Sequence, residues 1–357
     1  MHESGRRALA LWCVLLGGAV ALDTTAAANP AAIAKRSACE ARPAPPRVIL
    51  ISVDGLRPDA ITQQTAPNIA ALQAAGVRAA TALNDLPSAT LPNHASMLTG
   101  LTAELHGLLL NVDLPGTIPQ TTLFEYAAAA GLRTAFFASK TKLAFLAKPG
   151  ASEVVETEHE PQATVELLLP EICPEGPDLI FLHLAEPDST GHREGWMSPA
   201  YLAAVAEMDA LIGRIVAALD GETSRDTYIL LTADHGGEGL NHFLNIPEDR
   251  RIPWIVRGPR VPAGAVLNEV VSTVDTTATV LWLLGVDVPK GLSGRARTAI
   301  RDQTGAAVDV QSVMPPVGLP CVILMVPGLL LAMRVRPDRP RPGGPAAGCT
   351  AEPATAP

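Results

Sequence analysis

The sequence predicts an α/β fold in which helices cover both faces of a mostly parallel central sheet. Short apolar runs, each long enough for one strand, alternate along the chain with stretches of helical pattern. Polar residues hardly interrupt the strand runs, which is typical of strands buried on both faces. Acidic residues or histidines follow three of these runs closely. Because ligands of such sheets bind beyond the carboxyl ends of the strands, the sequence indicates one site at that edge.

Each expected element rests on its own local pattern. Continuous apolar runs predict strands at 47–53, 133–137, 178–184, 226–232 and 251–256. Amphipathic or alanine-rich stretches predict helices at 67–75, 95–98, 123–130, 199–219 and 274–284. Gly76 ends the first of these helices.

Composition excludes several functional classes. Hydrophobic residues make up 48% of the 357 residues and charged residues 18%, so the chain can bury a large core. A net charge of −9 argues against a surface that binds nucleic acid. The five cysteines are too few and too scattered for a disulfide scaffold. They show no CxxC spacing, which argues against a thiolate zinc site. A pairing of Cys39 with Cys173 after export stays open.

The two ends of the chain differ from its body. Residues 1–28 have the basic start, apolar run and small residues of a cleaved signal peptide, which implies a periplasmic or extracellular protein. An uncleaved anchor is the alternative. Residues 29–307 remain for the catalytic domain. Residues 308–357 contain an apolar segment, a candidate membrane anchor at 317–333, before a Pro-rich tail; the alternative is a disordered tail with no membrane contact.

Six residues that can bind metal lie at or soon after three predicted strand ends: Asp54, Asp188, His192, Asp234, His235 and His242. Alone, each is more typical of a turn, a cap or a packed side chain. Together, their mixed oxygen and nitrogen donors suit zinc or manganese better than calcium. Six ligands are too many for one open catalytic ion, so we expect two ions with three ligands each. His183, in mid-strand, is expected to pack in the core or support a ligand.

A candidate nucleophile lies in the segment SATLPNH. We expect Thr90 at the N-cap of a short helix, with Pro92 in its first turn. The N-terminus of a helix favours anions and would stabilise an alkoxide or a phosphoryl oxygen. The alternative is that Thr90 serves only as the cap.

Five ordered motifs carry a resemblance to a known family: ILISVDGLRPD, SATLPNHASMLTG, LHGLLLN, EPDSTGH and TADHGG. They resemble the alkaline phosphatase superfamily and, within it, the type I phosphodiesterase/nucleotide pyrophosphatase family. The resemblance runs from about Val48 to Val288. It implies an alkaline phosphatase-like sheet, and the sequence shows no large inserted cap domain.

The resemblance also implies roles for individual residues. One zinc ion would be held by Asp54, Asp234, His235 and Thr90. The other would be held by Asp188, His192 and His242, with manganese as an alternative metal. Thr90 would attack phosphorus in line and form a phospho-threonine intermediate, while Asn111 donates to a phosphoryl oxygen. In the pyrophosphatase members the last histidine lies far downstream of the DHG motif; here none follows His242, so His242 takes that place, as in relatives with a compact DHGGxGxxH arrangement.

Charge bears on the substrate, a small phosphate ester or a nucleotide. Two divalent ions carry four positive charges, and three aspartates with a threonine alkoxide carry four negative ones, which suits a monoanionic diester. A dianionic monoester would need further cations, which Lys140 and Lys142 could supply, so an alkaline phosphatase-type monoesterase stays the alternative. Thr90 cannot become the formylglycine of sulfatases. A non-catalytic surface module is the remaining alternative.

Overall fold

The computed structural model describes residues 44–148, 150–157 and 160–301. The expected signal peptide, the apolar segment at 317–333 and Cys39 lie outside these residues, so they stay predictions. The described residues belong to one compact unit. None of the helices within these ranges is long and apolar enough to span a membrane.

An eight-stranded sheet forms the centre of this unit, in the order β5-β4-β6-β1-β7-β8-β2-β9. Five adjacent strands, from β5 to β7, are parallel, and β8 is antiparallel to both of its neighbours. The bounds are β1 Arg47–Val53, β2 Val77–Ala79, β4 Thr134–Ala138, β5 Val154–Thr157, β6 Leu179–Leu184, β7 Thr227–Thr232, β8 Trp254–Arg257 and β9 Ala265–Leu267. A second, two-stranded sheet pairs β3 Ala82–Leu83 with β10 Val271–Ser272.

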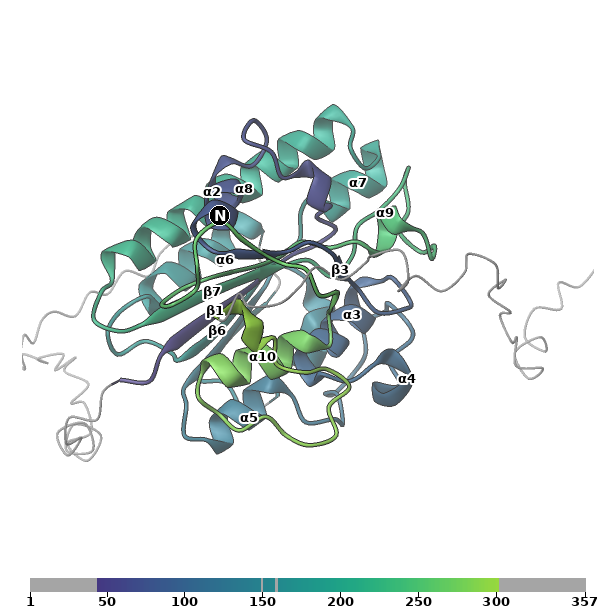
Figure 1. The fold of residues 1–357 in the computed structure, drawn as a ribbon. Coiled ribbons are helices and arrows are strands. Elements are labelled where there is room, and N and C mark those ends of the chain that lie inside the picture. Colours follow the sequence, from purple (N-terminus) through teal and green to yellow (C-terminus); the bar gives the residue numbers. More distant parts are fainter. Residues whose placement is uncertain (1–43, 149, 158–159, 302–357) are drawn as a thin grey trace, which may run out of the picture. The chain divides into compact units, whose positions relative to one another are not determined.

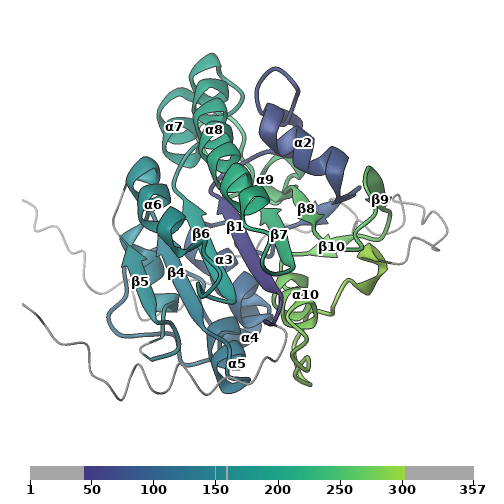
Figure 2. The same cartoon turned by 90° about the vertical axis from the view of Figure 1, so that its left-hand side faces the viewer.

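Helices cover both faces of the large sheet, as Figures 1 and 2 show. One face carries α2 Pro67–Ala75, α6 Pro161–Leu168, α7 Asp188–Glu194 and α8 Pro199–Gly221. The other carries α3 Thr90–Thr99, α4 Ala103–His106, α5 Leu123–Ala129 and α10 Asp275–Leu283. The remaining short helices are α9 Pro247–Arg250, η1 Pro58–Ala60, η2 Thr141–Leu146, η3 Leu169–Glu171 and η4 Thr298–Ile300.

The register of the central strands places their carboxyl ends at one level. All seven residues of β1 are buried, because helices pack on both of its sides. Ser52 of β1 lies opposite His183 of β6 and Thr232 of β7. The segments that leave β1, β6 and β7 therefore start side by side at the same edge of the sheet.

The predicted fold class is confirmed, and the differences lie in short or late elements. The strand at 47–53 and the helix at 67–75 match the prediction residue for residue. The helix expected at 95–98 runs from Thr90 to Thr99. The strand expected at 251–256 lies at Trp254–Arg257 and is antiparallel, and strands as short as β2 and β3 had no apolar run long enough to predict them.

Candidate metal centre

Four neighbouring strands supply the side chains of the candidate site. Asp54 follows β1 directly, Asp234 follows β7 after one residue, and Lys140 follows β4 after one residue. Asp188 begins α7 a short distance beyond β6. Because β4, β6, β1 and β7 are adjacent in the sheet, these residues from distant parts of the sequence meet above its carboxyl edge.

Asp54, Asp234 and His235 form the first compact group of potential metal ligands. Their ligand atoms all lie within 4.8 Å of one another, and all three residues are buried. His235 Nε2 lies 3.5 Å from Asp54 Oδ1 and 3.3 Å from Asp234 Oδ2. Two ligands of a tetrahedral zinc ion, each about 2.0–2.1 Å from the metal, lie about 3.3 Å apart. The structure thus brings together the three protein side chains predicted for the first ion, at a separation that fits zinc.

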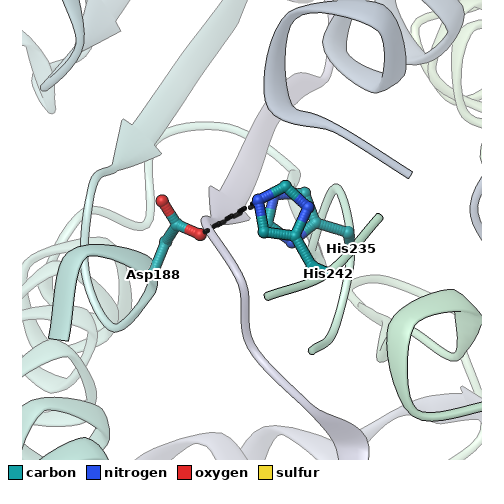
Figure 3. A group of neighbouring side chains, drawn as sticks. All are labelled: Asp188, His235 and His242. Carbon is teal, nitrogen blue, oxygen red and sulfur yellow. Dashed lines mark ion pairs between the residues drawn. The ribbon is translucent and has the colours of Figure 1, made fainter. Parts of the chain in front are cut away.

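A second compact group consists of Asp188, His235 and His242 (Figure 3). His242 Nε2 lies 3.8 Å from Asp188 Oδ1, and the rings of His235 and His242 stack with centroids 3.7 Å apart. His192, which we predicted in this set, lies at its outer side, with Nε2 3.5 Å from Asp188 Oδ1 and its side chain 37% exposed. His235 therefore faces both groups, whereas the prediction assigned it only to the first.

Hydrogen bonds at Nδ1 orient all three histidines in the same way. The partners are backbone carbonyls: Leu240 for His192, Gly236 for His235 and Ser88 for His242, at 2.7–2.9 Å. A carbonyl can only accept, so each Nδ1 carries a proton and each Nε2 faces the carboxylates, where in the neutral ring it can bind a metal ion. Histidines that bind metal are commonly fixed through their other nitrogen in this way.

Three buried carboxylate oxygens provide the test of whether metal ions fit. Asp54 Oδ1, Asp188 Oδ1 and Asp234 Oδ2 have no hydrogen-bond partner among the described residues. Buried, unpaired anionic oxygens are costly unless a cation is bound. These same atoms face the histidine Nε2 atoms. The site therefore fits a binuclear metal centre.

Among the described residues, Lys140 supplies the one lysine or arginine side chain that pairs with this cluster of carboxylates. Its Nζ lies 2.7 Å from Asp54 Oδ2 and 2.6 Å from Asp188 Oδ2, so it bonds the carboxylate oxygens that do not face His235 and His242. Burial alone would raise the pKa of Asp54, but Lys140 and a hydrogen bond from His183 hold it well below its usual range. Burial and the charge of Asp54 raise the pKa of Asp234 to about 7. A cation bound at Asp234 would therefore favour its ionised form.

Two further histidines, His183 and His94, are buried next to the candidate site. His183 Nε2 donates to Asp54 Oδ2 at 2.9 Å, so this buried mid-strand histidine contacts a potential metal ligand. His94 donates from Nδ1 to the Thr90 carbonyl and accepts at Nε2 from the Ser52 hydroxyl, both at 2.8 Å. Both rings are fully buried. Their contacts fix the backbone of Thr90 and one oxygen of Asp54.

Thr90 is the first residue of α3, and this corrects the prediction that it is the N-cap. Ala89 is the N-cap and offers no side-chain hydrogen bond. The Thr90 hydroxyl is therefore not used as a cap, and its nearest recorded partner is His235 Nε2 at 3.4 Å. At the start of α3, Leu91 N donates to Asn111 Oδ1, Asn93 N donates to the Ala89 carbonyl and Pro92 has no N–H. This leaves the N–H of Thr90 itself, with the positive end of the helix dipole, to favour an anion beside Thr90.

Asn111 and Lys142 lie next to this helix start. Asn111 Oδ1 accepts a hydrogen bond from Leu91 N at 3.1 Å and one from Lys142 Nζ at 3.4 Å. The carboxamide oxygen is thus engaged, and the amide NH₂ is left to donate. The structure places Lys142 beside Asn111 but commits Lys140 to two carboxylates, so the two lysines differ in their environment although they are two residues apart.

Trp196 contacts three of the loops that carry potential ligands, and it was not among the residues predicted from the sequence. Its Nε1 donates to the Gly55 carbonyl, and its backbone N donates to the Gly239 carbonyl. A Cβ on Gly191 or Gly237 would lie within 2.7 Å of its ring. The ring also lies 5.1 Å from His192 and 5.8 Å from His242, measured between centroids. A tryptophan four residues after His192, on the turn that ends α7, is the only signal that could have indicated it.

Comparison with known proteins is consistent with this geometry. The model of the family "Type I phosphodiesterase / nucleotide pyrophosphatase" matches residues 48–117 and 111–252, more than half of the chain. Human ectonucleotide pyrophosphatase/phosphodiesterase family member 7 is 27% identical over 220 residues, which cover 53% of this chain and 47% of that protein. Arylsulfatase K of Xenopus laevis is 38% identical over 101 residues, 26% of this chain and 19% of that protein. The chain spans about half or less of these curated relatives.

Solved structures share the fold at low sequence identity. A murine ectonucleotide pyrophosphatase/phosphodiesterase 5, an inactive variant in complex with AMP, superposes with a TM-score of 0.58 at 16% identity over 68% of this chain and 96% of that one. A 2-O GAG sulfatase superposes with a TM-score of 0.63 at 16% identity, covering 72% and 74% of the two chains. These similarities show a shared α/β architecture.

Proposed function

Because this chain belongs to the type I phosphodiesterase/nucleotide pyrophosphatase family, we propose that it hydrolyses phosphate diesters through a phospho-threonine intermediate on Thr90. The observation that carries the proposal is the set of buried carboxylate oxygens that have no hydrogen-bond partner among the described residues and face histidine Nε2 atoms, beside the Thr90 hydroxyl at 3.4 Å from His235 Nε2. The proposed substrates are small phosphate esters or nucleotide esters. The complex of the murine relative with AMP supports a nucleotide as one of them.

Two divalent ions, zinc in this proposal and manganese as the alternative, would act as Lewis acids that lower the pKa of a hydroxyl and balance developing negative charge. Asp54, Asp234 and His235 would hold one ion, and Asp188, His192 and His242 the other. The chain's own groups do the rest. Thr90 Oγ1 attacks phosphorus, the N–H of Thr90 at the start of α3 stabilises a phosphoryl oxygen, and the amide of Asn111 donates to another.

Charge balance favours a diester over a monoester. We proposed both Lys140 and Lys142 as the extra cations that a dianionic monoester needs. Lys140 Nζ is held by Asp54 and Asp188 at 2.7 and 2.6 Å, so it balances carboxylates already present. Only Lys142, beside Asn111, is left to meet the additional charge. Monoesterase activity is therefore the second candidate and depends on Lys142 alone.

A comparison of three substrates tests the proposal. Zinc-loaded and manganese-loaded protein is assayed with bis(p-nitrophenyl) phosphate, p-nitrophenyl phosphate and a nucleotide pyrophosphate. We expect the diester to give the highest kcat/KM. Thr90→Ala should lower kcat by about 10³-fold or more while the protein keeps its metal, and Thr90→Ser should retain measurable turnover. Full activity of Thr90→Ala would exclude Thr90 as the nucleophile.

A proposal for the cellular location rests on the signal peptide predicted at residues 1–28. We propose export to the periplasm or the extracellular space, with contact to a membrane through 317–333 as an additional proposal. Fractionation of cells that express the full chain tests both, because a cleaved, exported product and its partition between soluble and membrane fractions are separate results.

A further inference from the structure

Six of the eleven large hydrophobic side chains that are exposed among the described residues lie in two segments beside the metal groups. One segment carries Leu109, Leu110 and Val112, on either side of Asn111. The other carries Leu240, Phe243 and Leu244, which we call the 240–244 rim. The rim side chains are 52%, 56% and 60% exposed. Exposed apolar clusters of this kind, next to a polar site, commonly mark a surface that binds a ligand.

The backbone that carries the 240–244 rim is fixed by hydrogen bonds. Leu244 N donates to Asp249 Oδ2 at 2.6 Å, and the Leu240 carbonyl accepts from His192 Nδ1 at 2.9 Å. Glu238 and Asn241 form a reciprocal pair of backbone hydrogen bonds. The apolar side chains are therefore presented to solvent from a defined position, at the edge of the candidate metal centre.

A chain of contacts leads from the nucleophile to this rim. The Thr90 hydroxyl lies 3.4 Å from His235 Nε2, the His235 ring stacks on His242 at 3.7 Å, and the Phe243 ring lies 4.3 Å from that of His242. The Phe243 ring is also 6.5 Å from that of His192. In an in-line displacement the leaving oxygen departs on the side opposite to the attacking hydroxyl. A leaving group that lies across the stacked His235 and His242 rings from Thr90 would therefore lie next to Phe243.

We propose that the 240–244 rim binds the leaving group and selects phosphodiesters of an apolar alcohol or phenol. The inference rests on the proposed function and adds the class of leaving group. In the reaction, Thr90 Oγ1 forms a bond to phosphorus, the bond from phosphorus to the leaving oxygen breaks, and the departing alkoxide or phenoxide takes a proton from water. A charged leaving group such as pyrophosphate gains nothing from three apolar side chains.

A series of methyl 4-alkylphenyl phosphates tests the rim. The 4-alkylphenols have nearly the same acidity, so a longer alkyl chain changes contacts and not the chemistry of the leaving oxygen. With hydrogen, ethyl, butyl and hexyl substituents, kept below the concentration at which they aggregate, we expect kcat/KM to rise about two- to fourfold per methylene that the rim covers. The double substitution Phe243→Ser and Leu244→Ser should reduce this increase of kcat/KM with chain length. It should lower kcat/KM for the unsubstituted phenyl ester less than for the long-chain esters.

Leu167→Ser is the matched control, because Leu167 is an exposed leucine on α6, which the site does not use. This variant should show the same increase of kcat/KM with alkyl chain length as the unmodified protein. Hydrolysis of the unsubstituted ester with no dependence on chain length would overturn the rim assignment and leave the proposed function intact. A rise that persists in the serine variant, or one that occurs only above the aggregation threshold, would overturn it as well. Absence of hydrolysis of every diester would instead refute the proposed function.

Discussion

Replacement of Lys140 by glutamine tests the electrostatics of the candidate centre. The Nζ of Lys140 lies 2.7 Å from Asp54 Oδ2 and 2.6 Å from Asp188 Oδ2, and the side chains of these partners are 0% and 6% exposed. Removal of one partner from a buried ion pair costs about 3–5 kcal/mol, because the remaining charge is left uncompensated. Near the middle of that range, the unfolding equilibrium of the metal-free Lys140→Gln protein should shift about 10³-fold toward the unfolded state.

The same substitution should have a smaller effect once metal is bound. Divalent ions then balance Asp54 and Asp188, so the missing ammonium costs less. Equilibrium urea unfolding in EDTA and in saturating zinc measures both values. We expect the stabilisation that zinc confers on Lys140→Gln to exceed that of the unmodified protein by at least about 2 kcal/mol. Lys142→Gln is the control, since the recorded partner of Lys142 is the neutral Asn111. An equal loss of stability in EDTA and in zinc would refute the reasoning.

Three further substitutions have definite expected outcomes. Trp196→Leu should cost about 3 kcal/mol of unfolding free energy and weaken zinc binding, because it removes the contacts with His192 and the Gly55 carbonyl; unchanged zinc affinity in titration calorimetry would limit Trp196 to a packing role. His183→Phe should lower zinc affinity about 10- to 100-fold in a chelator competition, because Asp54 Oδ2 loses a donor; full affinity would contradict the support proposed for it. Lys142→Ala should lower monoester turnover more than diester turnover, and an unchanged ratio would exclude the monoester role of Lys142.

Most of the fold was predictable because the strands at its centre are buried on both faces. The run at 47–53 is apolar except for Arg47 and Ser52, so the extent of this strand was clear from the sequence. The short strands β2 and β9 were not predictable, because three residues carry no periodic signal. The antiparallel direction of β8 depends on tertiary pairing with β7 and β2, which no local pattern records.

The candidate site was predictable where a ligand directly follows a strand. Asp54, Asp234 and His235 came together as expected, because adjacent parallel strands end at one level. The second group was less predictable: His235 faces both groups, and His192 lies at the outer side of Asp188. The salt bridges of Lys140 could not be predicted, because they depend on the distances between three segments, after β4, after β1 and at the start of α7, that only the folded chain defines.

The number of metal ions per chain tests the central claim most directly. The protein is stripped with a chelator, reloaded with zinc, freed of excess metal and measured by elemental mass spectrometry, with Asp188→Asn and Asp234→Asn in parallel. The account predicts two zinc ions per chain in the unmodified protein and a loss of about one ion in each variant. Retention of no ion, or the full complement in both variants, would contradict a binuclear centre built from these carboxylates.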